Sequence, residues 1–186
     1  MTNPPVAKTG SGRFFEDFAV GQVLVHATPR TVSHGDVALY SALFGGRFAV
    51  QSADTFAYAI GYPRSPVDDL LAFHIVFGKT VADISINAIA NLGYAACRFL
   101  SPVYPGDTIS ASSQIIGLKE NSNRESGVVY VLSRGRSQHG ADVVDYVRWV
   151  MVRKRDKGAA APAPVVPDLI KALPVESLGD ACPILN

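Results

Sequence analysis

The stretch Leu70-Leu71-Ala72-Phe73-His74-Ile75-Val76-Phe77-Gly78-Lys79-Thr80-Val81 decides the fold of this 186-residue chain. If it forms a helix, apolar side chains stand on nearly all of its sides, and Asp68 or Asp69 can cap its first turn. Such a helix belongs in a core rather than on a surface. Other parts of the chain must therefore cover it.

Long apolar segments downstream predict the covering layer. The last of them, residues 142–155, alternates so that Val144, Tyr146, Arg148, Val150 and Val152 share one face. Short turns join these segments, which favours an antiparallel meander. The sequence predicts an α+β fold in which a curved antiparallel sheet wraps around a buried central helix. The expected strands are residues 22–26, 91–100, 108–119, 128–138 and 142–155.

An earlier helix is predicted by its ends. Ser33 is followed three residues later by Asp36, which is the spacing of a capping box, and the apolar pattern stops at Gly45-Gly46. His34 falls in the first turn of this helix, where we interpret it as part of the capping region. Residues 48–67, with Pro63 and Pro66, are expected to be irregular.

Composition divides the chain into three parts. Residues 1–12 are rich in Pro, Gly, Ser and Thr and are expected to be flexible. Residues 13–155 carry the periodic apolar signal of one domain. Residues 156–186 hold five of the twelve prolines and several alanines, which indicates a linker or an extended tail.

Charge and composition exclude several classes of function. The apolar fraction is 48% and the formal net charge is +1, which argues against nucleic acid or an anionic membrane surface as the partner. There is no apolar run long enough to span a membrane and no secretory signal, so the cytosol (a cytoplasmic location) is the default expectation. Cys97 and Cys182 have the spacing of neither a disulfide framework nor a metal site.

Three phrases carry a resemblance to a known family. Residues 14–22, 31–37 and 98–108 resemble, in order and spacing, the MaoC-like hydratases, which have a hot dog fold. Within that family, residues 73–95 and 146–156 resemble the first half of the mesaconyl-CoA hydratases, whose chains hold two hot dog halves. The resemblance implies that residues 13–155 form a single hot dog half of an enoyl-CoA hydratase/dehydratase.

The resemblance also implies what this half lacks. The family places its catalytic Asp and His in a Gly-Asp-x-Asn-Pro-x-His phrase after the first helix. The matching residues 45–51 have Gly46 in place of the aspartate and Gln51 in place of the histidine, and neither transfers protons near neutral pH. We therefore expect no catalytic residue, metal or redox cofactor here. A second hot dog half, in a homo- or heterodimer, would supply the pair. The alternative is a non-catalytic subunit that stabilises a partner or binds an acyl thioester.

The expected contribution of this half is to bind an acyl-CoA thioester. His74 is either a neutral hydrogen-bonding group in the tunnel or, as is more usual for a lone histidine on an apolar helix, a core residue bonded to a backbone carbonyl. Arg98 reaches an acyl carboxylate or a CoA phosphate, or it is simply solvated. The candidate substrate-binding residues are Ala72, Phe73, His74, Phe77, Gly78 and Arg98.

Other polar residues receive structural interpretations. His26 and His139 are expected at the surface, and Asp107 in a Pro-Gly-Asp turn. Lys79 should emerge at the helix end or find a partner such as Asp83. Cys97, within a predicted strand, is expected to be a core thiol. Arg47 and Arg64 flank the segment that would cover the tunnel mouth.

Overall fold

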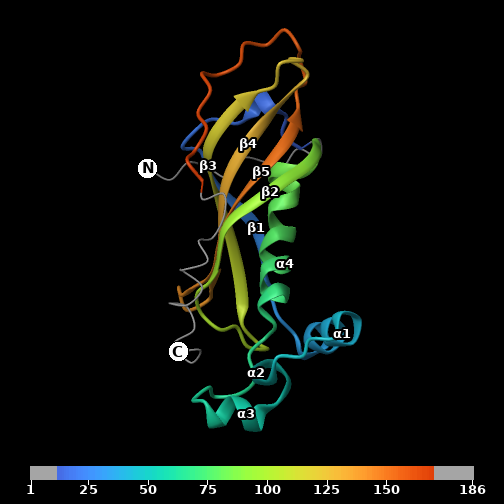
Figure 1. Ribbon diagram of the computed structural model, residues 1–186, viewed down its shortest axis with the longest axis vertical. Helices are drawn as coiled ribbons and strands as arrows, with labels where there is room; N and C mark the ends of the chain where they lie inside the picture. Colours follow the sequence, from blue (N-terminus) through green and yellow to red (C-terminus); the bar gives the residue numbers. More distant parts are fainter. Residues whose placement is uncertain (1–11, 170–186) are drawn as a thin grey trace, which may run out of the picture.

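The computed structural model describes residues 12–169. Five antiparallel strands form one sheet in the order β1-β3-β4-β5-β2, and helix α4 lies along one face of it (Figure 1). The strands are β1 (Val23–Thr31), β2 (Ala88–Phe99), β3 (Thr108–Glu120), β4 (Ser126–Ser137) and β5 (Asp142–Arg153). The helices are η1 (Phe15–Asp17), α1 (His34–Phe44), α2 (Ala49–Ser52), α3 (Asp54–Ala59), α4 (Asp69–Thr80) and the π-helical η2 (Val81–Ser85).

The predicted meander is only partly right. Strands β3, β4 and β5 follow one another across the sheet, but β2 pairs with β5 and does not neighbour β3. The connection between β2 and β3 crosses past β5 and β4, and hydrogen bonds from Leu100 N to Val143 O (2.9 Å) and from Val67 N to Val103 O (2.7 Å) hold it. Long-range contacts fix this crossing, so the local turn pattern could not reveal it.

The caps of both long helices confirm the sequence prediction. Ser33 and Asp36 form the capping box of α1, which ends at Gly45 with φ of 61°. Asp68 caps α4 by accepting a hydrogen bond from Leu70 N at 2.8 Å. The segment 48–67 is less irregular than predicted because it contains α2 and α3, which lie beyond the first turn of α4 (Figure 1).

Helix α4 is buried on one side only. Leu71, Ala72, Ile75 and Val76 pack against the sheet, together with Tyr146 of β5. On the other side Leu70, His74 and Gly78 are exposed. The prediction of a helix covered all round is therefore not met within residues 12–169, because the sheet covers only one of its faces.

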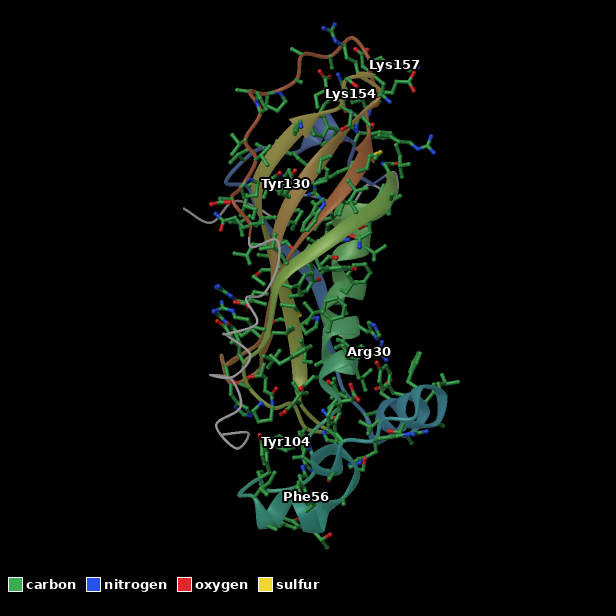
Figure 2. The ribbon with its side chains drawn as sticks, in the orientation of Figure 1. Arg30, Phe56, Tyr104, Tyr130, Lys154 and Lys157 are labelled. Carbon is green, nitrogen blue, oxygen red and sulfur yellow. The ribbon has the colours of Figure 1, made fainter. Side chains whose placement is uncertain are left out.

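The segment after β5 packs on the sheet. Val165 exchanges backbone hydrogen bonds with Leu118 (2.9 and 2.8 Å), and Gly117 lies so close that an added Cβ would stand 2.5 Å from the Val165 carbonyl oxygen. Lys154 is buried and pairs with Glu120 at 2.6 Å. Figure 2 shows Lys154 and Lys157 at the opposite end of the molecule from Phe56 of α3. Residues 156–169, the described part of the predicted tail, therefore dock on the sheet. The domain boundary at residue 155 stays a prediction.

Candidate functional site

The candidate site lies along the border between the covered and the open side of α4, where aromatic rings form a continuous strip from buried Tyr146 to exposed Tyr94. The ring of Phe73 lies 6.0 Å from that of Phe77 on the same helix, 5.7 Å from Tyr94 of β2 and 4.8 Å from Tyr146 of β5. Gly78 adds no side chain there, and a Cβ at its position would meet nothing within 4 Å. The helix thus presents a wall of rings with open space beside it.

His74 stands at the edge of this strip and is exposed, so the interpretation as a core histidine is wrong. Its Nδ1 lies 3.4 Å from the hydroxyl of Tyr40 in α1, and Phe44 contributes a ring 6.5 Å away. Burial raises the pKa of Tyr40, and the negative charge of Asp68 raises it further. His74 is therefore a hydrogen-bonding group at an accessible position.

The first turn of α4 has little free hydrogen-bonding capacity. Asp68 accepts from Leu70 N through its side chain, and its carbonyl oxygen accepts from Leu71 N (2.9 Å) and Ala72 N (3.2 Å). Gly46 lies beside this turn, since an added Cβ would stand 3.3 Å from Asp68 Oδ2. Asp68 is a cap, as expected, and these three N–H groups are not available to a substrate oxygen.

Arg98 is engaged elsewhere. Its Nε and Nη2 donate to the two carboxylate oxygens of Asp145 at 2.9 and 2.6 Å, and this pairing raises the pKa of Arg98. Asp145 is buried while the Arg98 side chain is largely exposed. Asp145 precedes Tyr146 on β5, so the two point to opposite faces of the sheet. The five candidates on α4 share one helix but not one face, because Ala72 is buried against the sheet whereas His74 and Gly78 are exposed. Arg98 lies apart from them.

Arg148 is a site residue that the sequence interpretation missed. It is 1% exposed, on the face of β5 that meets α4. Its Nη2 donates to Thr80 Oγ1 and Ser85 Oγ, both at 2.9 Å, and its guanidinium carbon lies 4.7 Å from the centroid of Phe77. The signal was available, because Arg148 stands within the alternating apolar face of residues 144–152.

His26 is buried at 3% exposure, so its predicted surface position is wrong. Its Nδ1 lies 2.7 Å from Asp83 Oδ2 and its Nε2 2.8 Å from Ser113 Oγ, which in turn lies 2.8 Å from Ser133 Oγ. This order of groups resembles a Ser-His-Asp triad, but Ser113 is itself buried and bonded to a second serine. The network joins β1, β3, β4 and η2 and has no opening for a substrate. Asp83 also binds Arg13 at 3.1 Å.

The structure also places three other residues that the sequence analysis interpreted, namely Lys79, Cys97 and Asp107. Lys79 donates to the carbonyl oxygen of Thr28. Cys97 is exposed, which corrects its expected place in the core, because β2 is an edge strand with a register shift between Ala95 and Arg98. Asp107 stabilises its turn, as predicted, by accepting from Tyr104 N at 2.8 Å.

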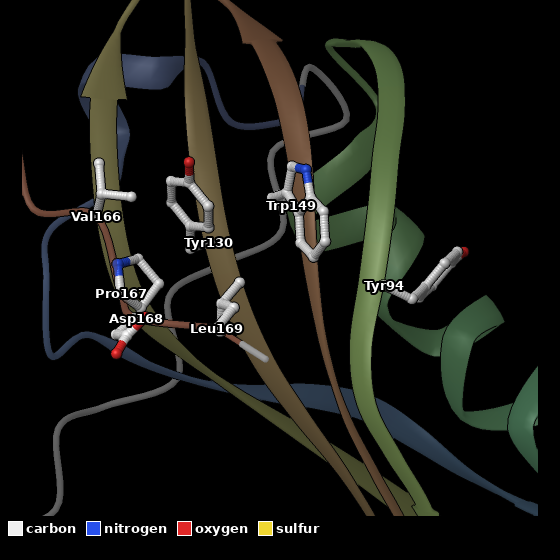
Figure 3. A pocket seen from close by; sticks show the side chains of 7 residues that line it. All are labelled: Tyr94, Tyr130, Trp149, Val166, Pro167, Asp168 and Leu169. Atoms are coloured by element: carbon white, nitrogen blue, oxygen red, sulfur yellow. The ribbon is translucent and has the colours of Figure 1, made fainter. Parts of the chain in front are cut away.

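Residues 12–169 offer few features of other kinds of site. No group of three or more His, Cys, Asp or Glu there could hold a metal ion. No helix in this part of the chain is long and apolar enough to cross a membrane. A pocket of about 590 Å³ lies on the sheet face away from α4, between the rings of Tyr130 and Trp149 and residues 166–169 (Figure 3).

Comparison with known proteins identifies the family. The sequence profile described as mesaconyl-CoA hydratase matches residues 6–167. The chain belongs to the mesaconyl-CoA hydratase family. It is 60% identical over 171 residues to the mesaconyl-CoA hydratase of Cereibacter sphaeroides, covering 92% of this chain and 50% of that protein. It is also 60% identical over 172 residues to the beta-methylmalyl-CoA dehydratase of Chloroflexus aurantiacus, covering 92% and 49%.

Solved structures support the fold. A putative MaoC domain protein dehydratase from Chloroflexus aurantiacus superposes with a TM-score of 0.87 at 60% identity, covering 91% of this chain and 48% of that one. Rv0216 of Mycobacterium tuberculosis, described as a double hot dog fold, gives 0.74 at 24% identity and covers 83% and 48%. The predicted hot dog fold is confirmed, and this mesaconyl-CoA hydratase family chain spans about half the length of the curated relatives it matches.

Proposed function

We propose that this chain is the substrate-tunnel half of a MaoC-like hydratase/dehydratase that reversibly hydrates a 2-enoyl-CoA such as mesaconyl-CoA. The observation that carries the proposal is the 60% identity to one half of a mesaconyl-CoA hydratase. The aromatic strip on α4 supports it, because an acyl chain is apolar and its hydration must be shielded from bulk water.

In this proposal the residues on α4 contact different parts of the substrate. Phe73 and Phe77 contact the acyl chain, Gly78 leaves it room, and His74 hydrogen-bonds to the thioester portion. Ala72 is buried and its N–H donates to the carbonyl oxygen of Asp68, so it packs α4 against the sheet and does not contact the substrate. Arg98 remains a candidate for contact with a CoA phosphate through the exposed part of its guanidinium.

The proton-transfer pair comes from a second hot dog half in this proposal. Adding water to an enoyl thioester requires a base for the water and an acid for the α-carbon. Gly46 and Gln51 provide neither. The same deficiency favours the alternative function, a non-catalytic subunit that stabilises a partner or binds an acyl thioester.

Strand β2 is the edge at which the second half would join. It lies beside the open face of α4, contains no Lys or Pro, and exposes Ile89, Leu92 and Phe99. The opposite edge, β1, is interrupted between His26 and Arg30, where Thr28 has φ of 63°. Such irregularities protect an edge strand from pairing, but β2 has three register shifts of its own. We choose β2 because its Tyr94 contacts the aromatic strip of α4 and because β1 contains Pro29. The partner is either a second copy or a separate subunit.

The test is turnover of mesaconyl-CoA and crotonyl-CoA, followed as loss of enoyl absorbance. We expect no turnover by the 186-residue chain and turnover when it is mixed with the half of the Cereibacter protein that it does not match. That half alone is the control. If the mixture forms a complex without turnover, the non-catalytic alternative holds. If the chain turns over substrate alone and His74→Ala abolishes this, another pair has replaced the missing one.

A further inference from the structure

Arg148 is a positively charged side chain buried beneath α4. It is 1% exposed, and no aspartate or glutamate among residues 12–169 forms an ion pair with it. A buried charge without a counter-ion is costly. The other buried cation, Lys154, does have a carboxylate partner in Glu120.

The neutral groups around Arg148 use only part of its donor capacity. Both hydrogen bonds, to Thr80 and to Ser85, come from Nη2. The Nε atom is buried and has no hydrogen-bond partner in residues 12–169. An arginine fork is suited to a carboxylate, which accepts two parallel hydrogen bonds.

The Tyr146 hydroxyl stands beside Arg148, because residues 146 and 148 are two apart on β5 and project to the same face, toward α4. Burial raises the pKa of Tyr146 to about 12, although side-chain hydrogen bonds with Ser133 and Thr80 act to lower it. Thr80 thus serves both side chains, and Nε of Arg148 is the donor in this cluster that is left without an acceptor in residues 12–169.

We infer that Arg148 is the residue that binds the free carboxylate at the far end of the acyl group, through the part of its guanidinium that is left without acceptors. This inference rests on the proposed function, because it places the acyl chain along α4. Phe77 is half-buried and its ring centroid lies 4.7 Å from the guanidinium carbon, so this ring must change its rotamer for a carboxylate to reach Arg148. Arg148 is then a specificity-determining residue and takes no part in proton transfer.

The experiment compares two ligands that cannot be hydrated and differ in the terminal carboxylate, succinyl-CoA and butyryl-CoA. Isothermal titration calorimetry gives their affinities for the 186-residue chain. We expect succinyl-CoA to bind about 10- to 100-fold more tightly, the range for a charge-assisted hydrogen bond. Arg148→Met should abolish the difference while leaving the affinity for butyryl-CoA within about 2-fold, and Arg148→Lys should keep part of it. Arg136→Met, at an exposed arginine paired with Asp142, is the matched control and should change neither affinity.

The outcomes separate this inference from the function it rests on. Equal binding of the two ligands, or equal weakening of both by Arg148→Met, overturns the role of Arg148 and leaves the acyl-CoA site intact. Binding of neither ligand overturns the proposed site in this chain, and the inference with it. Thermal unfolding provides a second reading, because an arginine without a counter-ion is not needed for folding. We expect the Tm of Arg148→Met to be unchanged or higher, and an unfolded variant would contradict the inference.

Discussion

At the residue scale, we expect Arg98 of β2 and Arg148 of β5 to differ in what their loss does to the Tm, because only Arg98 pairs with a buried carboxylate. Arg98→Met leaves the buried carboxylate of Asp145 without its two hydrogen bonds, so we expect the Tm to fall by roughly 2–4 °C. The double variant Arg98→Met/Asp145→Leu should recover most of the loss, because it leaves no buried carboxylate behind. Melting curves of the single and double variants measure this coupling. If the double variant melts no higher than Arg98→Met, Asp145 does not depend on Arg98.

Residue positions were predictable only where the signal was local. The turn role of Asp107 and the cap at Asp68 follow from neighbours within three residues. His26 was misplaced because its partners, Asp83 and Ser113, are 57 and 87 residues away in the sequence. The alternation of Leu24 with His26 was a usable signal, since both point into the core. His74 was misjudged because its exposure depends on how much of α4 a single sheet can cover.

At the element scale, α1 depends strongly on its cap, because only the partly buried side chains of Val37 and Tyr40 pack it against the core. None of its residues is buried. Ser33→Ala should therefore lower its local stability by about 1 kcal/mol, the usual value of an N-cap. We expect faster amide exchange confined to α1, with exchange in β4 unchanged as the internal control. Equal acceleration in both elements would mean that α1 unfolds only with the whole domain.

The same helix should respond to acid. Hydrogen bonds from the Ser33 backbone and side chain lower the pKa of Asp36 below 3.8. A carboxylate whose pKa is lowered by folding stabilises the fold when the pH is above its pKa in the unfolded chain. This contribution is lost as the pH falls through its pKa in the folded chain. Exchange in α1 should thus accelerate relative to β4 below about pH 4. Asp36→Asn should remove this dependence.

Element positions were predicted better than element order. The strand at residues 108–119 became β3 at Thr108–Glu120, and the helix at residues 70–81 became α4 at Asp69–Thr80. The transfer of β2 to the far edge of the sheet was not predictable from periodicity, which specifies faces and not neighbours. Helices α2 and α3 were not predicted, because they are only one or two turns long and the segment of residues 48–67 that contains them has two prolines.

At the scale of the whole molecule, residues 12–169 leave one face of α4 and the β2 edge of the sheet uncovered, which predicts self-association when no second half is present. Size-exclusion chromatography with light scattering at micromolar concentration should show dimers or larger species. A lysine on an edge strand opposes pairing. Leu92→Lys on β2, where the side chain is exposed, should therefore give a monomer with an unchanged Tm. Val25→Lys, at an exposed position on β1, is the matched control and should still associate. If Val25→Lys gives the monomer and Leu92→Lys does not, the second half joins at β1, and the aromatic strip of α4 is not what it covers.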